Sequence, residues 1–280
     1  MKKITRRSFL AAAGLTAAAL ALTACGGSSS STASSVASSA AASSEAASSS
    51  AAAAELATVE AGKLTMATNA AFPPYEMTTD AGDFEGIDIE TAQAIADKLG
   101  LELQIDDMDF DAALLSVQQG KADIVMAGVT VTDERKAVMD FSDSYATGIQ
   151  SIIVPEGSDI ASPDDLAGKK IGTQRGTTGY IYCSDDFGDE NVVAYDDGLT
   201  AVQALNNGQV DAVVIDNAPA KEFIAANPGL VILETSYAEE DYAIGLAKGS
   251  SLEDAINSAL EEMKADGTLQ SIVDKYISAK

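Results

Sequence analysis

Two short segments of the chain repeat the same order of features 88 positions apart. Gly120 opens Gly-Lys-Ala-Asp, followed by the apolar residues 124–127, and Gly208 opens Gly-Gln-Val-Asp, followed by the apolar residues 212–215. A stretch with apolar residues at helical spacing precedes each glycine, so each unit is predicted to be a helix, a glycine turn and a buried strand. Helices that alternate with strands predict an α/β fold with mostly parallel sheets, and one such unit in each half predicts two similar lobes.

The residues that follow these two strands are candidates for a binding site. Gly128 and Thr130 come directly after the first strand, and Asp216 comes directly after the second. Ligands of open parallel sheets bind beyond the carboxyl ends of the strands. Two lobes that face each other would therefore place these residues across one cleft.

The N-terminal region is predicted to direct and anchor the protein. Residues 1–24 form a predicted signal peptide, because a basic head precedes a short apolar stretch. That stretch ends in Leu-Thr-Ala-Cys, which resembles a bacterial lipobox, so Cys25 is predicted to carry lipid; an incidental cysteine beyond an ordinary cleavage site is the alternative. Residues 25–57, rich in Ser and Ala, are predicted to be a disordered tether. We expect an extracytoplasmic protein, lipid-anchored to the outer face of the cell membrane, and the Arg6-Arg7 pair leaves general and twin-arginine export open.

The composition excludes several classes of function. The chain carries 43 acidic and 17 basic residues, a formal net charge of −26, so nucleic acid is a poor partner. It has no histidine, and its cysteines are Cys25 and Cys183, which removes most zinc sites and the common histidine-based catalytic groups. The acidic cluster at 106–111 lacks the spacing of a known calcium loop and is predicted to be solvated surface. We therefore expect no metal and no cofactor, and a buried or half-buried Cys183.

Two arginines lie beyond the signal region, and a guanidinium group can hold a carboxylate with two parallel hydrogen bonds. Arg135 ends a Gly/Thr segment that runs from a buried strand into a short helix, which is typical of an anion site. A surface arginine paired with Asp133 or Glu134 is the alternative. Arg175 lies in a second Gly/Thr turn that lacks the Gly-Lys-Ser/Thr ending of a nucleotide loop, and it could face the cleft or the solvent.

Asp216 closes a strand that is predicted to be fully buried, so its carboxylate is expected at the edge of the sheet over the cleft. An ammonium group is the natural partner of such a carboxylate. The alternative is an aspartate that caps the helix beginning at Asn217. An arginine in one lobe and a carboxylate in the other suit a zwitterion, and the commonest zwitterions are free amino acids.

From Lys63 onward the chain resembles the polar amino-acid group of ABC-importer solute-binding proteins, which is solute-binding protein family 3. Its members include glutamine- and histidine-binding proteins. Seven segments, in this order and spacing, carry the resemblance: Ala67-Thr-Asn-Ala-Ala-Phe-Pro-Pro-Tyr75, Gly86-Ile-Asp-Ile89, Met108-Asp-Phe110, Gly120-Lys-Ala-Asp123, Ala127-Gly-Val-Thr-Val-Thr-Asp-Glu-Arg135, Asp140-Phe-Ser-Asp143 and Gly176-Thr-Thr178.

The resemblance implies a two-lobe periplasmic-binding-protein fold of type II, in which each lobe is a mostly parallel sheet flanked by helices and the ligand lies in the cleft between the lobes. Two crossings near 145–149 and 238–242 are implied. Lobe one is then 58–147 plus 242–280, and lobe two is 148–241. The implied mechanism is hinge closure of a monomer around a free amino acid, followed by docking on the transmembrane subunits of an ABC permease, with no bond made or broken.

The resemblance also assigns roles in the site. Arg135, Thr130 and the N–H groups around Thr178 are implied to hold the α-carboxylate. Asp216 and the carbonyl of Gly128 are implied to hold the α-ammonium group. Phe72 and Phe110 are implied to sandwich the ligand, and ordinary core positions are the alternative for both. The full predicted set is Asn69, Phe72, Phe110, Ala127, Gly128, Thr130, Arg135, Gln174, Thr177, Thr178 and Asp216.

Asn69 departs from the pattern of the glutamine- and histidine-binding relatives, which carry an acidic residue at this position to meet the ligand side chain. An amide weakens the case for a cationic ligand and leaves neutral polar or acidic ligands open. Gln174, the other expected side-chain contact, is also neutral. The sequence therefore predicts a polar, non-basic amino acid.

Two other functions use the same fold. One is a dehydratase acting on prephenate-like acids, which needs a proton donor in the cleft, and the sequence offers no histidine and no obvious second cleft carboxylate for that role. The other is a sensory module that reports its ligand to a receptor. We therefore expect a binding protein and not an enzyme.

Overall fold

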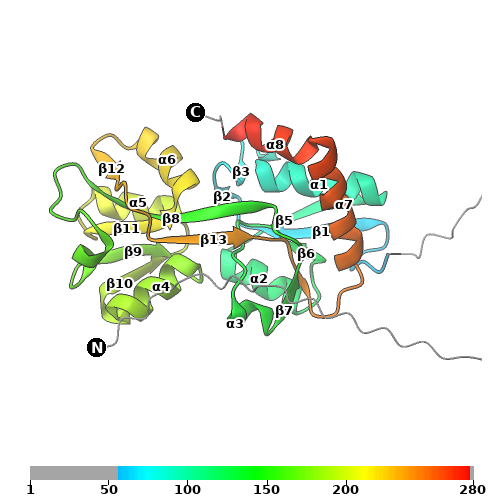
Figure 1. Ribbon diagram of the computed structural model, residues 1–280, viewed down its shortest axis with the longest axis horizontal. Coiled ribbons are helices and arrows are strands. Elements are labelled where there is room, and N and C mark those ends of the chain that lie inside the picture. Colours follow the sequence, from blue (N-terminus) through cyan, green and yellow to red (C-terminus); the bar gives the residue numbers. More distant parts are fainter. Residues whose placement is uncertain (1–55, 278–280) are drawn as a thin grey trace, which may run out of the picture. The chain divides into compact units, whose positions relative to one another are not determined.

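The computed structural model describes residues 56–277, shown as coloured ribbons in Figure 1. The predicted signal peptide, the lipidation site Cys25 and nearly all of the predicted tether lie outside the described residues. Among residues 56–277 no helix is both long and apolar enough to cross a bilayer.

The described residues form a five-stranded sheet, a six-stranded sheet and a small three-stranded sheet. The first large sheet has the order β5 (Glu102–Asp107), β1 (Lys63–Thr68), β6 (Ile124–Val125), β14 (Gly245–Ala247) and β7 (Met139–Phe141). The second has the order β10 (Val192–Tyr195), β9 (Ile171–Gln174), β11 (Ala212–Asp216), β8 (Ala146–Pro155) and β12 (Leu230–Ile232), with β13 (Ala238–Tyr242) also paired to β8. The small sheet is β2 (Ala71–Phe72), β3 (Glu76–Thr78) and β4 (Phe84–Glu85).

The α/β architecture in two lobes is as predicted, and each large sheet contains one strand that runs against an otherwise parallel set. In the first sheet β1 pairs in parallel with β5 and β6, and in the second β9 pairs in parallel with β10 and β11. The antiparallel members are β14 in the first sheet and β8 in the second. β8 itself crosses between the lobes, and β14 follows the crossing strand β13, so each of the two enters its sheet from the opposite end.

Helices flank both large sheets. Around the first sheet lie α1 (Ile87–Leu99), α2 (Phe110–Gln118), α3 (Asp133–Lys136), α7 (Glu253–Asp266) and α8 (Thr268–Tyr276); around the second lie α4 (Thr178–Phe187), α5 (Gly198–Asn206) and α6 (Asn217–Ala226). Two 3₁₀ turns, Pro163–Leu166 and Asp189–Asn191, complete the set. Ser162 forms a capping box at the start of the first of these turns, which ends after four residues.

Each large sheet separates two apolar cores. In the first lobe, Leu64 and Ile95 belong to the core beneath α1, α7 and α8, whereas Val117 and Val125 belong to a separate core beneath α2. In the second lobe, the neighbours Val213 and Val214 on β11 belong to different cores, because successive side chains of a strand point to opposite faces. Both sheets are therefore covered on both faces, which leaves the strand ends as the place for a ligand. Cys183 is fully buried in the second lobe, as predicted.

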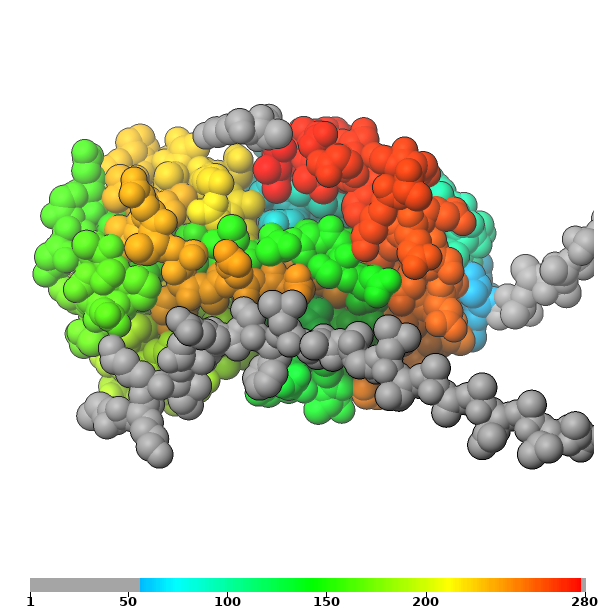
Figure 2. All heavy atoms as spheres, viewed as in Figure 1, coloured from blue at the N-terminus to red at the C-terminus, as the bar shows by residue number. Residues whose placement is uncertain are grey.

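Two long strands connect the sheets. β8 and β13 pair antiparallel from Ala238 opposite Gln150 to Tyr242 opposite Ala146. The predicted crossings fall on these strands, and Figures 1 and 2 show them as green and orange segments running side by side between the two lobes. Along β13 the side chains alternate, so that Glu239 is exposed and Glu240 is buried. The lobe limits at 147/148 and 241/242 stay a prediction.

Candidate ligand site

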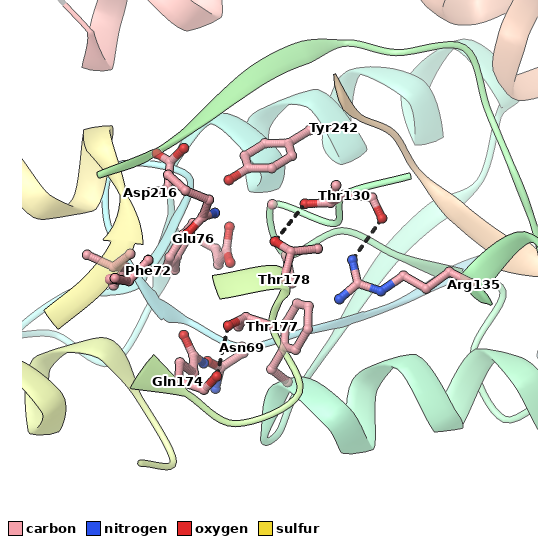
Figure 3. A pocket seen from close by; sticks show the side chains of 16 residues that line it. Asn69, Phe72, Glu76, Thr130, Arg135, Gln174, Thr177, Thr178, Asp216 and Tyr242 are labelled. Atoms are coloured by element: carbon pink, nitrogen blue, oxygen red, sulfur yellow. Dashed lines mark hydrogen bonds between the residues drawn. The ribbon is translucent and has the colours of Figure 1, made fainter. Parts of the chain in front are cut away.

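All eleven residues predicted for the site line one pocket, together with five more, Glu76, Gln150, Val214, Ile215 and Tyr242 (Figure 3). The pocket lies where four strands of the two sheets end. Asn69 follows β1, Gly128 lies beyond β6, Gln174 ends β9 and Asp216 ends β11. The structure thus brings the predicted residues together, and their contact with a ligand stays a prediction.

Arg135 is buried, with 8% of its surface exposed, so the alternative of a surface arginine is wrong. Thr132 places it locally, since the Thr132 hydroxyl accepts the N–H of Arg135 at 3.1 Å and caps the short helix α3. Its Nη1 donates to the carbonyl of Thr130 at 2.7 Å, and its Nη2 donates to the carbonyl of Gly176 at 3.2 Å. The guanidinium lies 5.4 Å from the centre of the Phe110 ring. A guanidinium has five N–H donors, so further donors remain for a carboxylate.

Arg175 faces the solvent, which is one of the two positions that the sequence left open for it. Its side chain is 52% exposed and lies 3.5 Å from a carboxylate oxygen of Asp196. It does not line the pocket. This surface arginine of the second lobe is a useful comparison for Arg135, because the two share chemistry and differ in burial.

Asp216 combines both roles that the sequence left open. One carboxylate oxygen accepts the N–H of Ala218 at 2.9 Å and caps α6, and the other accepts the N–H of Ile149 at 2.7 Å. The residue is 2% exposed and lines the pocket. Burial raises the pKa of the Asp216 carboxyl to about 6, against the two backbone N–H groups, which favour the charged form. A carboxylate oxygen can accept more than one hydrogen bond, so the cap leaves capacity for an ammonium group.

Gly128 occupies a position where a side chain would not fit. Its φ is 54°, and a Cβ there would lie 3.0 Å from the Phe72 ring and 3.3 Å from the Tyr242 ring. The N–H of Gly128 donates to Asp88 at 3.0 Å, and the hydroxyl of Tyr145 donates to the other oxygen of Asp88 at 2.7 Å. This buried anchor fixes the peptide beside the pocket.

The two amides predicted to meet the ligand side chain meet each other. Gln174 donates from Nε2 to Oδ1 of Asn69 at 2.8 Å, and Asn69 donates from Nδ2 to the carbonyl of Met108 at 2.9 Å. Asn69 belongs to the first lobe and Gln174 to the second. Their bond therefore joins the lobes and fixes the orientation of both amides.

Glu76 is the most consequential pocket residue that the sequence analysis missed. It is fully buried at the start of β3, and neither carboxylate oxygen accepts a hydrogen bond from an N–H or O–H of the described residues. Burial, then the charge of Asp88 and a hydrogen bond shared with it, raise the pKa of the Glu76 carboxyl well above its usual range. Burial also raises the pKa of Asp88 to about 6. Two buried carboxyls in contact favour a shared proton, and burial favours the neutral form of Glu76.

Gln150 and Glu240 were also missed. Both are buried on strands. Glu240 lies between two exposed neighbours in the run Glu-Glu-Asp, which resembles solvated surface. The available signal was the two-residue period of a strand, which puts Glu240 on the same face as Tyr242. Among the described residues no group of three or more histidine, cysteine, aspartate or glutamate side chains is placed to hold a metal ion.

Two helix-flanked α/β lobes, joined by paired strands and enclosing a polar pocket at their strand ends, define the type II periplasmic-binding-protein fold. Residues 64–279 match the profile of the bacterial extracellular solute-binding proteins, family 3, and the chain belongs to this family.

Relatives and solved structures agree with this assignment. The chain is 33% identical over 225 residues to the L-cystine-binding protein TcyJ of Escherichia coli (strain K12), covering 79% of this chain and 84% of the relative. It is 32% identical over 228 residues to the arginine-binding extracellular protein ArtP of Bacillus subtilis (strain 168), covering 78% and 87%. The structure of an ancestral arginine-binding protein bound to arginine matches with a TM-score of 0.74 and 43% identity, over 78% of this chain and 99% of that one.

Proposed function

We propose that the protein captures a free amino acid by closing its lobes on this pocket and delivers it to the transmembrane subunits of an ABC permease. The observation that carries the proposal is the pairing of a buried guanidinium, Arg135, with a buried carboxylate, Asp216, in one pocket between two lobes. A zwitterion neutralises both charges at once. Desolvation inside a closed pocket strengthens both contacts.

The backbone half of the ligand is assigned first. Arg135 and the N–H groups at the start of α4 hold the α-carboxylate, where the helix dipole adds to the attraction. Asp216 and the carbonyl of Gly128 hold the α-ammonium group. Phe72 and Phe110 enclose the ligand and exclude water.

The side-chain half is proposed to be polar and uncharged. With Glu76 protonated in its pair with Asp88, the formal charges of Arg135 and Asp216 cancel within the pocket lining. The amides of Asn69 and Gln174 offer hydrogen bonds without charge. Glutamine is a ligand of this kind, and a solved ancestral relative holds glutamine.

A basic amino acid is the second candidate, and Glu76 favours it. A cationic side chain near this buried carboxyl would displace its proton and form an ion pair. Several relatives are named as arginine-binding proteins, among them ArtP. The two candidates differ in proton release, because only a basic ligand would drive the proton from Glu76.

The remaining expectations are part of the same proposal. Cys25 carries the lipid anchor, residues 25–57 form the tether, and the protein acts as a monomer outside the cytoplasm. The pocket binds its ligand and releases it unchanged, as expected of a solute-binding protein and not of a dehydratase.

The test is a thermal-shift screen of the protein against the twenty amino acids and cystine, followed by calorimetry with each compound that stabilises it. Arg135→Ala is expected to weaken binding at least about a hundredfold, because it leaves a carboxylate desolvated and unpaired. Arg175→Ala is the matched control and is expected to leave affinity unchanged. Equal affinity of wild type and Arg135→Ala would sink the carboxylate assignment, and no stabilisation by any compound would sink the proposed function.

A further inference from the structure

The carboxylate of Glu240 collects hydrogen bonds from both lobes. One oxygen, Oε2, accepts from the Thr178 hydroxyl at 2.9 Å, the Gln150 amide at 3.0 Å and the Thr130 hydroxyl at 3.1 Å. Glu240 lies on the connecting strand β13 and is 7% exposed. It does not line the pocket, whereas all three of its partners do. It therefore acts on the pocket through them.

The two threonine hydroxyls have their protons assigned by this arrangement. A hydroxyl has one proton and two lone pairs, and an ionised carboxylate can only accept. Thr130 and Thr178 therefore both direct their protons to Glu240, and their own 3.4 Å contact adds no donor. What each hydroxyl presents to the pocket is a lone pair.

The direction of these two hydroxyl protons determines which hydrogen bonds a ligand can make with Thr130 and Thr178. A hydroxyl whose proton is already donated to Glu240 cannot donate to the ligand carboxylate, so the donors to that carboxylate are Arg135 and backbone N–H groups. The same hydroxyl can accept a hydrogen bond from an ammonium group, which only donates. The negative charge of Glu240 adds to this selection, and it also raises the pKa of Arg135 against the effect of burial.

We propose that Glu240 is a positioning residue of the amino-acid site, which turns the Thr130 and Thr178 hydroxyls into acceptors and so makes binding depend on the α-ammonium group. The inference rests on the proposed function. It goes beyond the direct contacts of that function, because Glu240 touches no ligand and acts through two side chains from different lobes.

The test compares amino acids with analogues that lack only the α-ammonium group. The pairs are L-glutamine with glutaramic acid and L-arginine with 5-guanidinopentanoic acid, measured by calorimetry. In Glu240→Gln the negative charge is lost, and the two threonine protons are held by a weaker, uncharged acceptor. The ratio of the analogue's Kd to that of the amino acid is expected to fall about tenfold, as for one charge-assisted hydrogen bond. Glu239→Gln, the same change on the exposed face of β13, is expected to leave the ratio unchanged.

Equal weakening of an amino acid and its analogue in Glu240→Gln would overturn the proposal, because a merely structural residue would affect both alike. A second measurement needs no ligand. The hydroxyl protons of Thr130 and Thr178 are expected as slowly exchanging NMR signals in the wild type that disappear in Glu240→Ala. Their absence from the wild type would overturn the proposal even if the protein bound none of these probes, whereas failure of every amino acid to bind would overturn only the proposed function.

Discussion

Replacing Glu76 with glutamine tests the charge balance of the pocket most directly. Glu76 is fully buried and receives no hydrogen bond from an N–H or O–H group of the described residues, and burial is the largest cause of its raised pKa. A glutamate that is protonated near pH 7 in the folded protein is almost the same size and shape as glutamine. The amide can also donate to Asp88 in place of the carboxyl proton. The substitution therefore removes an ionisable group and little else.

The expected size of the effect follows from the proton that folding must take up. In the unfolded chain a glutamate has a pKa of about 4.3, so at pH 7 it must be protonated against a gap of about 2.7 pH units, which costs about 4 kcal/mol. Glutamine has no such cost. Glu76→Gln is therefore expected to raise the free energy of unfolding by up to about 4 kcal/mol at pH 7 and by almost nothing at pH 4.

The direction of the pH dependence of stability follows from proton linkage. A carboxyl whose pKa is raised by folding binds more protons in the native state than in the unfolded state, so wild-type stability falls as pH rises above the unfolded pKa. Urea denaturation of both proteins at pH 4, 5.5 and 7 measures this difference. Glu85→Gln, an exposed position in the same small sheet, is the control and is expected to change little. A variant whose stability relative to wild type is the same at all three pH values would refute a neutral Glu76.

Two further predictions concern other parts of the site. The pKa of Asp216 is raised to about 6, so its carboxylate loses the charge that attracts the ammonium group as pH falls from 7.5 to 5, and amino-acid binding is expected to weaken. Calorimetry at both pH values measures this change. A constant affinity would contradict the role of Asp216. Gly128→Ala is expected to lower the free energy of unfolding by about 2–3 kcal/mol and to weaken ligand binding, because a Cβ would lie 3.0 Å from the Phe72 ring and would strain the backbone. The control is Gly100→Ala, at φ 69° with open space around it. It is expected to lower the free energy of unfolding by only about 1 kcal/mol and to leave binding intact.

The backbone half of the site was predictable because it depends on short segments of sequence. Gly128, Thr130 and Arg135 lie within one segment of eight residues, so their spacing along the chain already fixes them near one strand end. Asp216 was predictable from its place directly after an apolar strand. Whether it capped a helix or faced the cleft could not be decided from the sequence, and the structure gives both, because a carboxylate has several acceptor positions.

Glu76 and Glu240 could not be recognised in the same way. Glu76 stands in a segment rich in proline and aromatic residues, and Glu240 in the polar run Glu-Glu-Asp, and neither context predicts a buried carboxyl in the site. The burial of Glu240 involves contacts with residues far along the chain, Thr130 and Thr178. The antiparallel strands were missed for a related reason. The direction of β8 and β14 depends on crossings between the lobes, which local propensity does not encode.

Electrostatics narrows the ligand beyond what the two amides allowed. Asn69 and Gln174 left acidic ligands open, but the described site holds four buried carboxyl groups, Glu76, Asp88, Asp216 and Glu240, around the single guanidinium of Arg135. An acidic amino acid would bring a second carboxylate, and Arg135 is already assigned to the first. Without a cation of its own, that carboxylate would remain desolvated among like charges, which costs several kcal/mol. A neutral side chain meets no such cost, and a basic one would gain from Glu76, so we infer that acidic amino acids are excluded.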